Sequence, residues 1–278
     1  MKPLLTLALV VLAAAAGTAR RSADVVRTVH FSAVDAKGVP VTDLAAADVT
    51  VKEGGKDRAV GTLTAATMPM HLSILVDDGG TGGFQGALSQ LIQDTFGATA
   101  YSIRVLSPQA IKVAEATRDG DELRAAVRRI GPRGRIQVDT EQIIAGVTDA
   151  AQELREHRAR RAAIIAFTAA GEKTQSDLAD EAMDALQSSG ASLSVIYVTG
   201  VGLGRVLGDG PRQSGGIIEQ VTGGSGLAPA VAKITDTLRK QYVLTYTVPD
   251  GVKLNERLAL STSRKGVKLI APTRLPDK

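Results

Sequence analysis

The chain of 278 residues contains neither cysteine nor tryptophan, and only four phenylalanines and four tyrosines. The absence of cysteine excludes disulfide bonds, thiolate metal sites, thiol catalysis and a lipoprotein anchor. Because aromatic residues amount to 3%, nucleic-acid binding by base stacking is not expected. A hydrophobic content of 44% beside 22% charged residues is typical of a globular protein, whose core must here be built from Ala, Val, Leu and Ile.

The N-terminus carries the pattern of a targeting signal. Lys2 precedes an apolar run that continues to Ala16, and Ala19 offers the small residue that signal peptidase accepts. We expect a signal peptide over residues 1–19, with cleavage after Ala16 or Ala23 as alternatives. A membrane span needs about 20 apolar residues, and no other segment approaches that length. The sequence therefore predicts an exported, soluble mature protein, periplasmic or extracellular, without a membrane span.

The net charge of +4 owes part of its excess to one arginine-rich stretch. The stretch also contains Glu153 and Glu156 and has four arginines near the end of a predicted helix: Arg155, Arg158, Arg160 and Arg161. Cations at that place complement the helix dipole. We interpret the stretch as a solvated helix end and expect no nucleic-acid partner.

Three zones follow the signal. Residues 24–66 and 241–278 contain short β-patterns separated by Gly-rich turns, and each zone is too small to fold alone. Residues 67–240 alternate apolar strand patterns with amphipathic helix patterns, which indicates a mainly parallel sheet with helices on both faces. We expect a Rossmann-like α/β domain over 67–240, inserted into a small β-sandwich that the strands of 24–66 and 241–278 form together.

Within the α/β zone, continuous apolar runs predict buried parallel strands over 72–76, 162–167 and 193–198. Helical spacing of apolar residues predicts helices over 84–96 and 140–157, among others. Two further predictions concern the end of the zone. Gly200 to Gly216 is expected to be a long Gly-rich loop, either mobile or part of a partner surface, and residues 217–221 a short helix.

The candidate functional site follows the first buried strand. Asp77 and Asp78 end that strand, a turn of two glycines and Thr81 comes next, and a helix pattern follows. In open α/β sheets, ligand sites lie at the carboxyl ends of strands. A phosphate loop is not expected, because no Gly-Lys-Ser/Thr follows. The three histidines are scattered without zinc spacing or a nucleophile, so no catalytic or cofactor-binding residues are predicted.

Five segments in order resemble the bacterial secreted VWFA-related family, a branch of the von Willebrand factor A domains. The first two, 36–44 and 48–56, match an N-terminal pattern DxxGxPVxDLxxxDFxVxEDGK. Residues 72–81 match the metal-site strand, 221–224 match a TGG turn, and 238–246 match LRxQYxLxY. The resemblance implies a von Willebrand A domain for the α/β zone and a metal-ion-dependent adhesion site at its top face.

In the family, that site holds Mg²⁺ through a D-x-S-x-S strand end, a Thr from a second loop and an Asp from a third. The resemblance assigns the first motif to Asp77, Gly79 and Thr81, of which Gly79 has no side-chain oxygen. It assigns the second-loop ligand to Thr140. The third-loop Asp is replaced by Ala169. The implied ligands are therefore Asp77, Thr81 and Thr140, in a site that has lost two of its five members.

Three acids in the same loops could compensate for the losses: Asp78, Asp139 and Glu172. Oxygen ligands of this kind suit Mg²⁺ or Ca²⁺, so a weak metal site and a degenerate, metal-free site both stay open. The resemblance implies an exported, non-enzymatic protein-binding or adhesion-type module that uses the top face of the A domain. The alternative is a structural or assembly component of the cell envelope that acts through its β-sandwich and helical faces.

Overall fold

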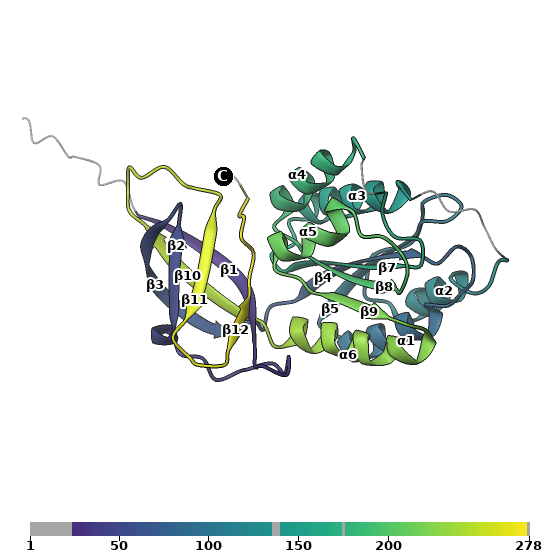
Figure 1. The fold of residues 1–278 in the computed structure, drawn as a ribbon, viewed down its shortest axis with the longest axis horizontal. Coiled ribbons are helices and arrows are strands. Elements are labelled where there is room, and N and C mark those ends of the chain that lie inside the picture. The colour runs from purple at the N-terminus through teal and green to yellow at the C-terminus, as the bar shows by residue number, and fades with distance from the viewer. Residues whose placement is uncertain (1–23, 135–139, 174–175, 277–278) are drawn as a thin grey trace, which may run out of the picture.

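The computed structural model describes residues 24–134, 140–173 and 176–276, which form two units side by side (Figure 1). One unit is an antiparallel sheet, here called the β-unit. The other is a layered α/β unit, which the chain enters after the third strand and leaves before the tenth. The predicted signal peptide lies outside the described residues. Among the helices that are described, none is long and apolar enough to cross a membrane.

The α/β unit contains a six-stranded sheet in the order β6-β5-β4-β7-β8-β9. Its strands are β4 (Met70–Asp77), β5 (Thr99–Val105), β6 (Ile111–Thr117), β7 (Ala162–Thr168), β8 (Ser192–Val198) and β9 (Ile218–Val221). The strands pair in parallel except β6, which runs antiparallel to β5 at one edge. The predicted mainly parallel sheet is confirmed.

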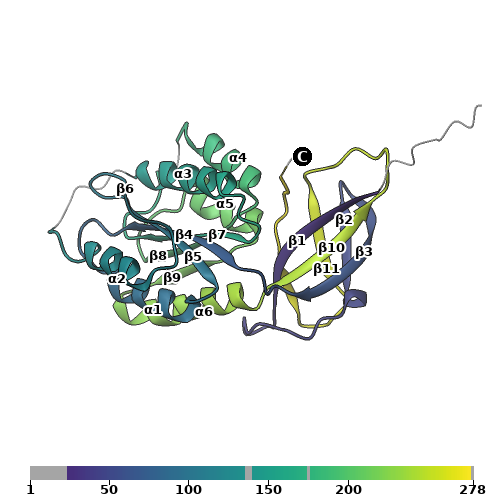
Figure 2. The ribbon, with the colours of Figure 1, turned by 180° about the vertical axis from the view of Figure 1, so that it is seen from behind.

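Helices cover both faces of this sheet, as Figures 1 and 2 show from opposite sides. One face carries α1 (Gln85–Thr95), α2 (Gly120–Arg129) and α6 (Gly224–Arg239), and the other carries α3 (Gln142–Glu156), α4 (Ala179–Ser189) and α5 (Arg205–Ser214). Strand β4 shows why both faces are needed: Leu72 and Ile74 belong to the first core and Leu75 to the second. A strand that is apolar on both sides must be covered on both sides.

The β-unit mixes strands from the two ends of the described chain. It contains β1 (Val25–Val34), β2 (Val49–Glu53), β3 (Lys56–Ala65), β10 (Tyr242–Val248), β11 (Leu258–Thr262) and β12 (Lys268–Ile270). A single 3₁₀ turn, η1 (Ala46–Asp48), precedes β2. The strand order is β11-β2-β3-β10-β1-β12, with every pairing antiparallel. The prediction that N- and C-terminal strands pair with each other is confirmed.

The predicted sandwich is matched only in part, because these strands form one curled sheet. Its two edges approach each other after β12. The Leu258 amide donates to the Thr273 carbonyl (2.9 Å), and the Leu275 amide donates to the Glu256 carbonyl (2.7 Å). The curled sheet encloses its own core, in which the rings of Phe31 and Tyr242 stack with centroids 5.4 Å apart. Edge strands that pair with each other leave fewer unpaired backbone groups.

Two local predictions were wrong. The segment from Gly200 to Gly216, expected to be a loop, contains helix α5, and residues 217–221, expected to be helical, contain strand β9. Strand β9 pairs in parallel with β8, and Val195 donates its amide to the Ile217 carbonyl (2.9 Å) just before β9 begins. A four-residue segment takes its conformation from such a neighbour rather than from its own pattern.

Arg161 fixes the junction of the two units. Its buried guanidinium donates to the carbonyl oxygens of Ala66, Met68 and Leu238. It also donates to Oε1 of Gln241 (3.1 Å). These acceptors belong to the two segments by which the chain passes between the units, so one side chain holds both crossings.

Candidate functional site

Asp77, the first residue of the predicted site, lies where the parallel strands of the α/β sheet have their carboxyl ends. In chain order, the six strands of this sheet are arranged 3-2-1-4-5-6, with β4 first and β7 fourth. The connections therefore leave β4 and β7 in opposite directions, and the crevice between them is where doubly wound sheets bind ligands. Asp77 ends β4 and pairs in register with Thr168, the last residue of β7. We call the loops around this crevice, residues 78–84, 107–110, 169–173 and 199–204, the rim.

Asp77 is fully buried at the base of the rim. Its Oδ1 accepts a hydrogen bond from the Ser107 hydroxyl (2.7 Å), and its Oδ2 accepts one from the Thr168 hydroxyl (3.3 Å). Burial raises the pKa of the Asp77 carboxyl, and these two hydrogen bonds oppose the rise. Both carboxylate oxygens thus have a partner within the protein.

Asp78 organises the turn that follows. It is buried, and its carboxylate accepts hydrogen bonds from the amides of Gly80 (2.9 Å) and Gly82 (2.7 Å). Arg133, from the loop after α2, approaches the same carboxylate at 3.4 Å. An aspartate that binds amides two and four residues ahead is a common device for closing a turn.

The two predicted hydroxyl ligands, Thr81 and Thr140, do not take part in the hydrogen bonds of the Asp77 carboxylate. The Thr81 hydroxyl donates to the carbonyl of Asp78 (3.0 Å) and accepts from the Gly83 amide (3.2 Å), so it belongs to the turn. Thr140 is half-buried and stands two residues before α3. In the described part of the chain, neither is hydrogen-bonded to Asp77. Asp139 lies outside the described residues.

Glu172, predicted as a possible compensating metal ligand, binds the start of helix α5 instead. Its buried carboxylate accepts hydrogen bonds from the backbone amides of Val206 (2.8 Å) and Leu207 (2.6 Å) in the first turn of α5. Burial raises the pKa of Glu172, and the two amide hydrogen bonds oppose the rise. Because the first amides of a helix have no partner within it, a carboxylate there caps the helix and complements its dipole. The capping residue comes from a distant loop.

These contacts decide how well the rim fits a metal ion. Mg²⁺ requires several oxygen ligands in near-octahedral geometry, and Ca²⁺ requires still more. Gly79 and Ala169 offer no side-chain oxygen, while Asp78 and Glu172 already satisfy backbone amides. Asp77 is turned toward two hydroxyl groups. The described residues therefore do not fit a complete shell for either ion.

Sequence reasoning missed the two residues that Asp77 contacts. Ser107 follows β5 and Thr168 ends β7, the strands on either side of β4. A signal was present, because both are hydroxyl residues at the carboxyl end of an apolar strand. In a parallel sheet such positions meet at one edge. Only the strand order shows which of them flank Asp77.

A second group of titratable side chains lies on the α3 face of the sheet. Ligand atoms of Glu115, Glu153 and His157 lie within 4.8 Å of one another, which makes them a candidate metal cluster. Glu153 is also bound by Arg104 (2.6 Å) and Lys112 (3.2 Å). Burial favours a higher pKa for Glu153, but the Ser102 hydroxyl and these cations outweigh it, so the pKa is lowered. Two cations already neutralise this cluster.

A serine and a histidine meet beside that cluster. Nε2 of His71 lies 3.1 Å from the hydroxyl of Ser102, and Glu153 accepts from the same hydroxyl (2.5 Å). Ser102 is fully buried, and the carboxylate contacts the serine rather than the imidazole. A nucleophile needs an accessible hydroxyl and a base that the acid orients. The arrangement is therefore part of the core.

Comparison with known proteins concerns the fold alone. No protein-family model matches the sequence, and no curated protein matches it. Similar solved structures include a von Willebrand factor type A protein from Catenulispora acidiphila, at 10% identity, with 94% of this chain and 76% of that chain covered and a TM-score of 0.49. Proximal thread matrix protein 1 from the mussel byssus is 10% identical over 65% of this chain, with a TM-score of 0.46.

This chain spans about half, 49%, of the mussel protein, of which another structure has a zinc-occupied MIDAS motif. The minor pilin PilB from Streptococcus sanguinis is 11% identical, with 63% of this chain and 62% of that chain covered and a TM-score of 0.43. At these identities the similarities say nothing about ligands or partners.

Proposed function

We propose that this chain is an exported, non-enzymatic binding module that takes a protein partner at the rim, and that hydrogen bonds rather than a metal ion organise the rim. One observation carries the proposal. The three described acids at the base of the rim and within it, Asp77, Asp78 and Glu172, are all buried and bound to hydroxyl groups or backbone amides. Carboxylates held in this way preorganise the loops without a cation.

The outer surface of the rim suits contact with another protein. Most of its exposed residues are small and uncharged, among them Thr81, Gly83, Ala169, Thr199 and Gly200. The exposed Lys173 is charged and forms an ion pair with Glu141 (2.7 Å). Small side chains let a partner approach the backbone closely. They stand at the switch point of the sheet, where this class of fold binds its ligands. The resemblance of five sequence segments to the VWFA-related family supports the same surface, and the N-terminal pattern supports export.

The proposal of a non-enzymatic role rests on accessibility. In the described chain, the Ser102–His71 contact is buried. Asp77 is likewise inaccessible to solvent. Catalytic groups must reach a substrate. We therefore propose that the rim binds and does not react.

Site-specific crosslinking tests the proposal directly. Since the chain has no cysteine, one cysteine at a time can carry a photoactivatable crosslinker. Ala169→Cys places it on the rim, and Gln90→Cys places it on an exposed position of α1 as the matched control. We expect a defined protein adduct from the rim position, formed in the producing cells, that is absent from the control. Equal or no labelling at the two positions would count against rim binding.

The alternative role in envelope assembly is tested with the same chemistry. Thr64→Cys places the crosslinker on exposed β3 of the β-unit. Adducts from Thr64 without adducts from Ala169 would favour the alternative. The structure offers it limited support, because the two edges of the curled sheet already pair with each other near Arg257 and Arg274.

A calorimetric titration with Mg²⁺, Mn²⁺ and Ca²⁺ tests the metal-free part of the proposal. Because the oxygen donors of the rim are engaged or missing, we expect no binding heat up to millimolar metal. A saturable signal that disappears in Asp77→Ala would contradict this expectation and restore a metal-dependent rim.

A further inference from the structure

A second site lies at the opposite end of the parallel sheet from the rim. A cleft of about 810 Å³ opens between the two units, where α3 and α4 end and β7 and β8 begin. Its other wall consists of β1 and the segment that follows β12, including Arg274 and Pro276. Pockets for small ligands commonly occur at such interfaces between folding units, with volumes of roughly 300–1,000 Å³.

Among the described residues, the charged side chains of this cleft have one sign. They include five arginines and no aspartate or glutamate; the arginines are Arg155, Arg158, Arg160, Arg161 and Arg274. Four come from the end of α3 and the connection to β7, and Arg274 comes from the β-unit. The last turn of a helix attracts cations, which accounts for Arg155. It does not account for Arg274, which approaches from the other unit.

Most of these guanidinium groups are free to bind an anion. Arg161 is used by the junction. Arg274 forms a long ion pair with Glu256 (3.7 Å) and donates a long hydrogen bond to Oε1 of Gln187 (3.4 Å). Arg158 and Arg160 are exposed and have no carboxylate partner among the described residues. The planar fork of a guanidinium matches carboxylate and phosphate groups with two parallel hydrogen bonds.

Two polar atoms in the walls lack a partner. The hydroxyl of Ser192 and Nε2 of His30 are buried and make no hydrogen bond in the described structure, and both residues line the cleft. Ser192 is only 8% exposed. A buried polar group without a partner costs roughly 1–3 kcal/mol. Since solvent does not reach these two atoms, they belong to the wall behind the cleft, and the proposed ligand contacts rest on the arginines.

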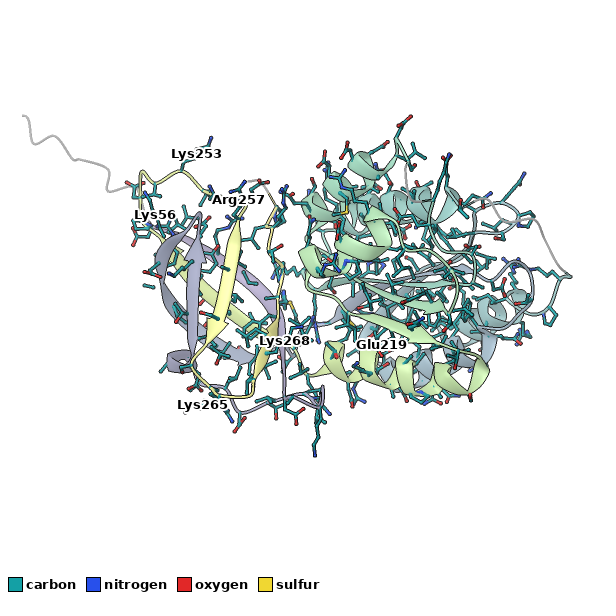
Figure 3. All side chains as sticks on the ribbon, in the orientation of Figure 1. Lys56, Glu219, Lys253, Arg257, Lys265 and Lys268 are labelled. Atoms are coloured by element: carbon teal, nitrogen blue, oxygen red, sulfur yellow. The ribbon has the colours of Figure 1, made fainter. Side chains whose placement is uncertain are left out.

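Five cations of the β-unit show a different distribution. Figure 3 shows Lys56, Lys253, Arg257, Lys265 and Lys268 spread over the β-unit, from its upper end to its lower end. None of them lines the cleft. Dispersed surface cations attract anions weakly and are screened by salt. The arginines of the cleft differ because they line one cleft from two units.

We propose that the cleft binds a small organic anion with more than one carboxylate or phosphate group. Arg158 and Arg160 hold it from the α/β unit, and Arg274 holds it from the β-unit. Apolar parts of the ligand contact Met68 and Leu154, which also line the cleft. The cleft lies at the opposite end of the parallel sheet from the rim, so anion binding in the cleft does not depend on partner binding at the rim. Because its ligand bridges both units, binding stabilises their relative arrangement.

Calorimetry with citrate and with inorganic pyrophosphate tests the proposal. The two probes distinguish carboxylate from phosphate recognition. We compare the unchanged chain with the double variant Arg158→Gln/Arg160→Gln. The control is Arg128→Gln/Arg129→Gln, which removes the same charge from two exposed arginines at the end of another helix, α2. Loss of two charge-assisted contacts should weaken binding by roughly tenfold or more in the cleft variant and leave the control unchanged.

Arg274→Gln supplies an independent variant from the other wall, and we expect it to weaken the same probe. Circular dichroism verifies that each variant is folded. The proposal is overturned if neither probe binds the unchanged chain. It is also overturned if the α2 control loses as much affinity as the cleft variant, because the effect would then follow net charge alone.

Discussion

Asp77 is a buried carboxylate whose hydrogen bonds come from neutral groups. Ser107 and Thr168 donate to it, and in the described structure no lysine or arginine forms an ion pair with it. A charge without a counter-charge is expensive to bury, which is why its pKa is raised. The same environment that preorganises the rim therefore lowers the stability of the folded protein at neutral pH.

This balance predicts that Asp77→Asn is more stable than the unchanged chain at pH 7. The amide keeps the shape and an acceptor oxygen for Ser107 but removes the buried charge. Since the pKa is raised on folding, the folded state binds the proton more tightly. Stability should then fall as pH rises from the ordinary value of 3.8 through the raised value. Urea unfolding at several pH values should show this component in the unchanged chain and not in the variant.

The prediction would be contradicted if the unchanged chain were more stable than Asp77→Asn at pH 7, and only when Mg²⁺ is added. It would mean that a cation compensates the buried charge. The comparison is therefore made with and without a chelator.

His30 has the opposite pH dependence. Burial, and then the charge of Arg161, lowers the pKa of its imidazole from 6.5 to about 4. Between these two pH values the His30 imidazole is protonated in the unfolded chain and neutral in the folded chain. Stability is therefore fully present above pH 6.5 and is lost as pH falls toward 4, by up to about 3 kcal/mol.

We expect His30→Gln to remove this loss. Urea unfolding at pH 7 and pH 4.5 should show a smaller difference for the variant than for the unchanged chain. His157→Gln is the matched control, because the His157 side chain is 41% exposed. An equal reduction in both variants would contradict the assignment to His30.

At the scale of elements, α5 shows how a distant residue can determine local structure. The helix contains two glycines and Pro211, and the sequence predicted a loop for this segment. Its first turn is bound by Glu172, and Val206 and Leu207 are fully buried against the α4 side of the sheet. Neither contact is visible in the local pattern, because Glu172 lies more than 30 positions earlier.

Glu172→Ala should therefore destabilise the protein by about 2 kcal/mol, the size expected for lost hydrogen bonds from a buried charged cap. Urea unfolding measures the change. Glu156→Ala, which removes an exposed acid at the end of α3, is the control and should be near neutral. Faster amide hydrogen exchange confined to α5 would locate the effect. An unchanged exchange rate there would contradict the capping role.

Elements with strong patterns were predicted well. Strands β4, β7 and β8 are mainly apolar and almost wholly buried, and α1 and α3 repeat apolar residues at helical spacing. These elements are buried whichever other elements pack against them, so their burial can be recognised from the local pattern alone. Strand β9 has four residues and becomes a strand only because β8 offers an open edge.

For the whole molecule, the decisive residue is Arg161. It contacts both segments that connect the β-unit with the α/β unit. We interpret it as the connection that makes the two units unfold together.

Arg161→Met should destabilise the protein by at least about 3 kcal/mol, because it leaves several buried acceptors without a donor. It should also separate thermal unfolding into two transitions, observed by calorimetry. Arg129→Met, an exposed arginine on α2, is the control. A single transition of unchanged midpoint in Arg161→Met would contradict the role of this side chain as the link.

The sequence by itself determined the alternation of strands and helices, the pairing of the two chain ends and the place of Asp77 at a strand end. Apolar periodicity and turn residues are local, so they can be read along the chain. Tertiary structure alone decided that Ser107 and Thr168 bind Asp77, that Glu172 caps α5, and that arginines from two units face one cleft. These facts depend on which loops and edges meet in space. A carboxylate available to a metal and one already satisfied by amides look alike in sequence, and only their neighbours distinguish them.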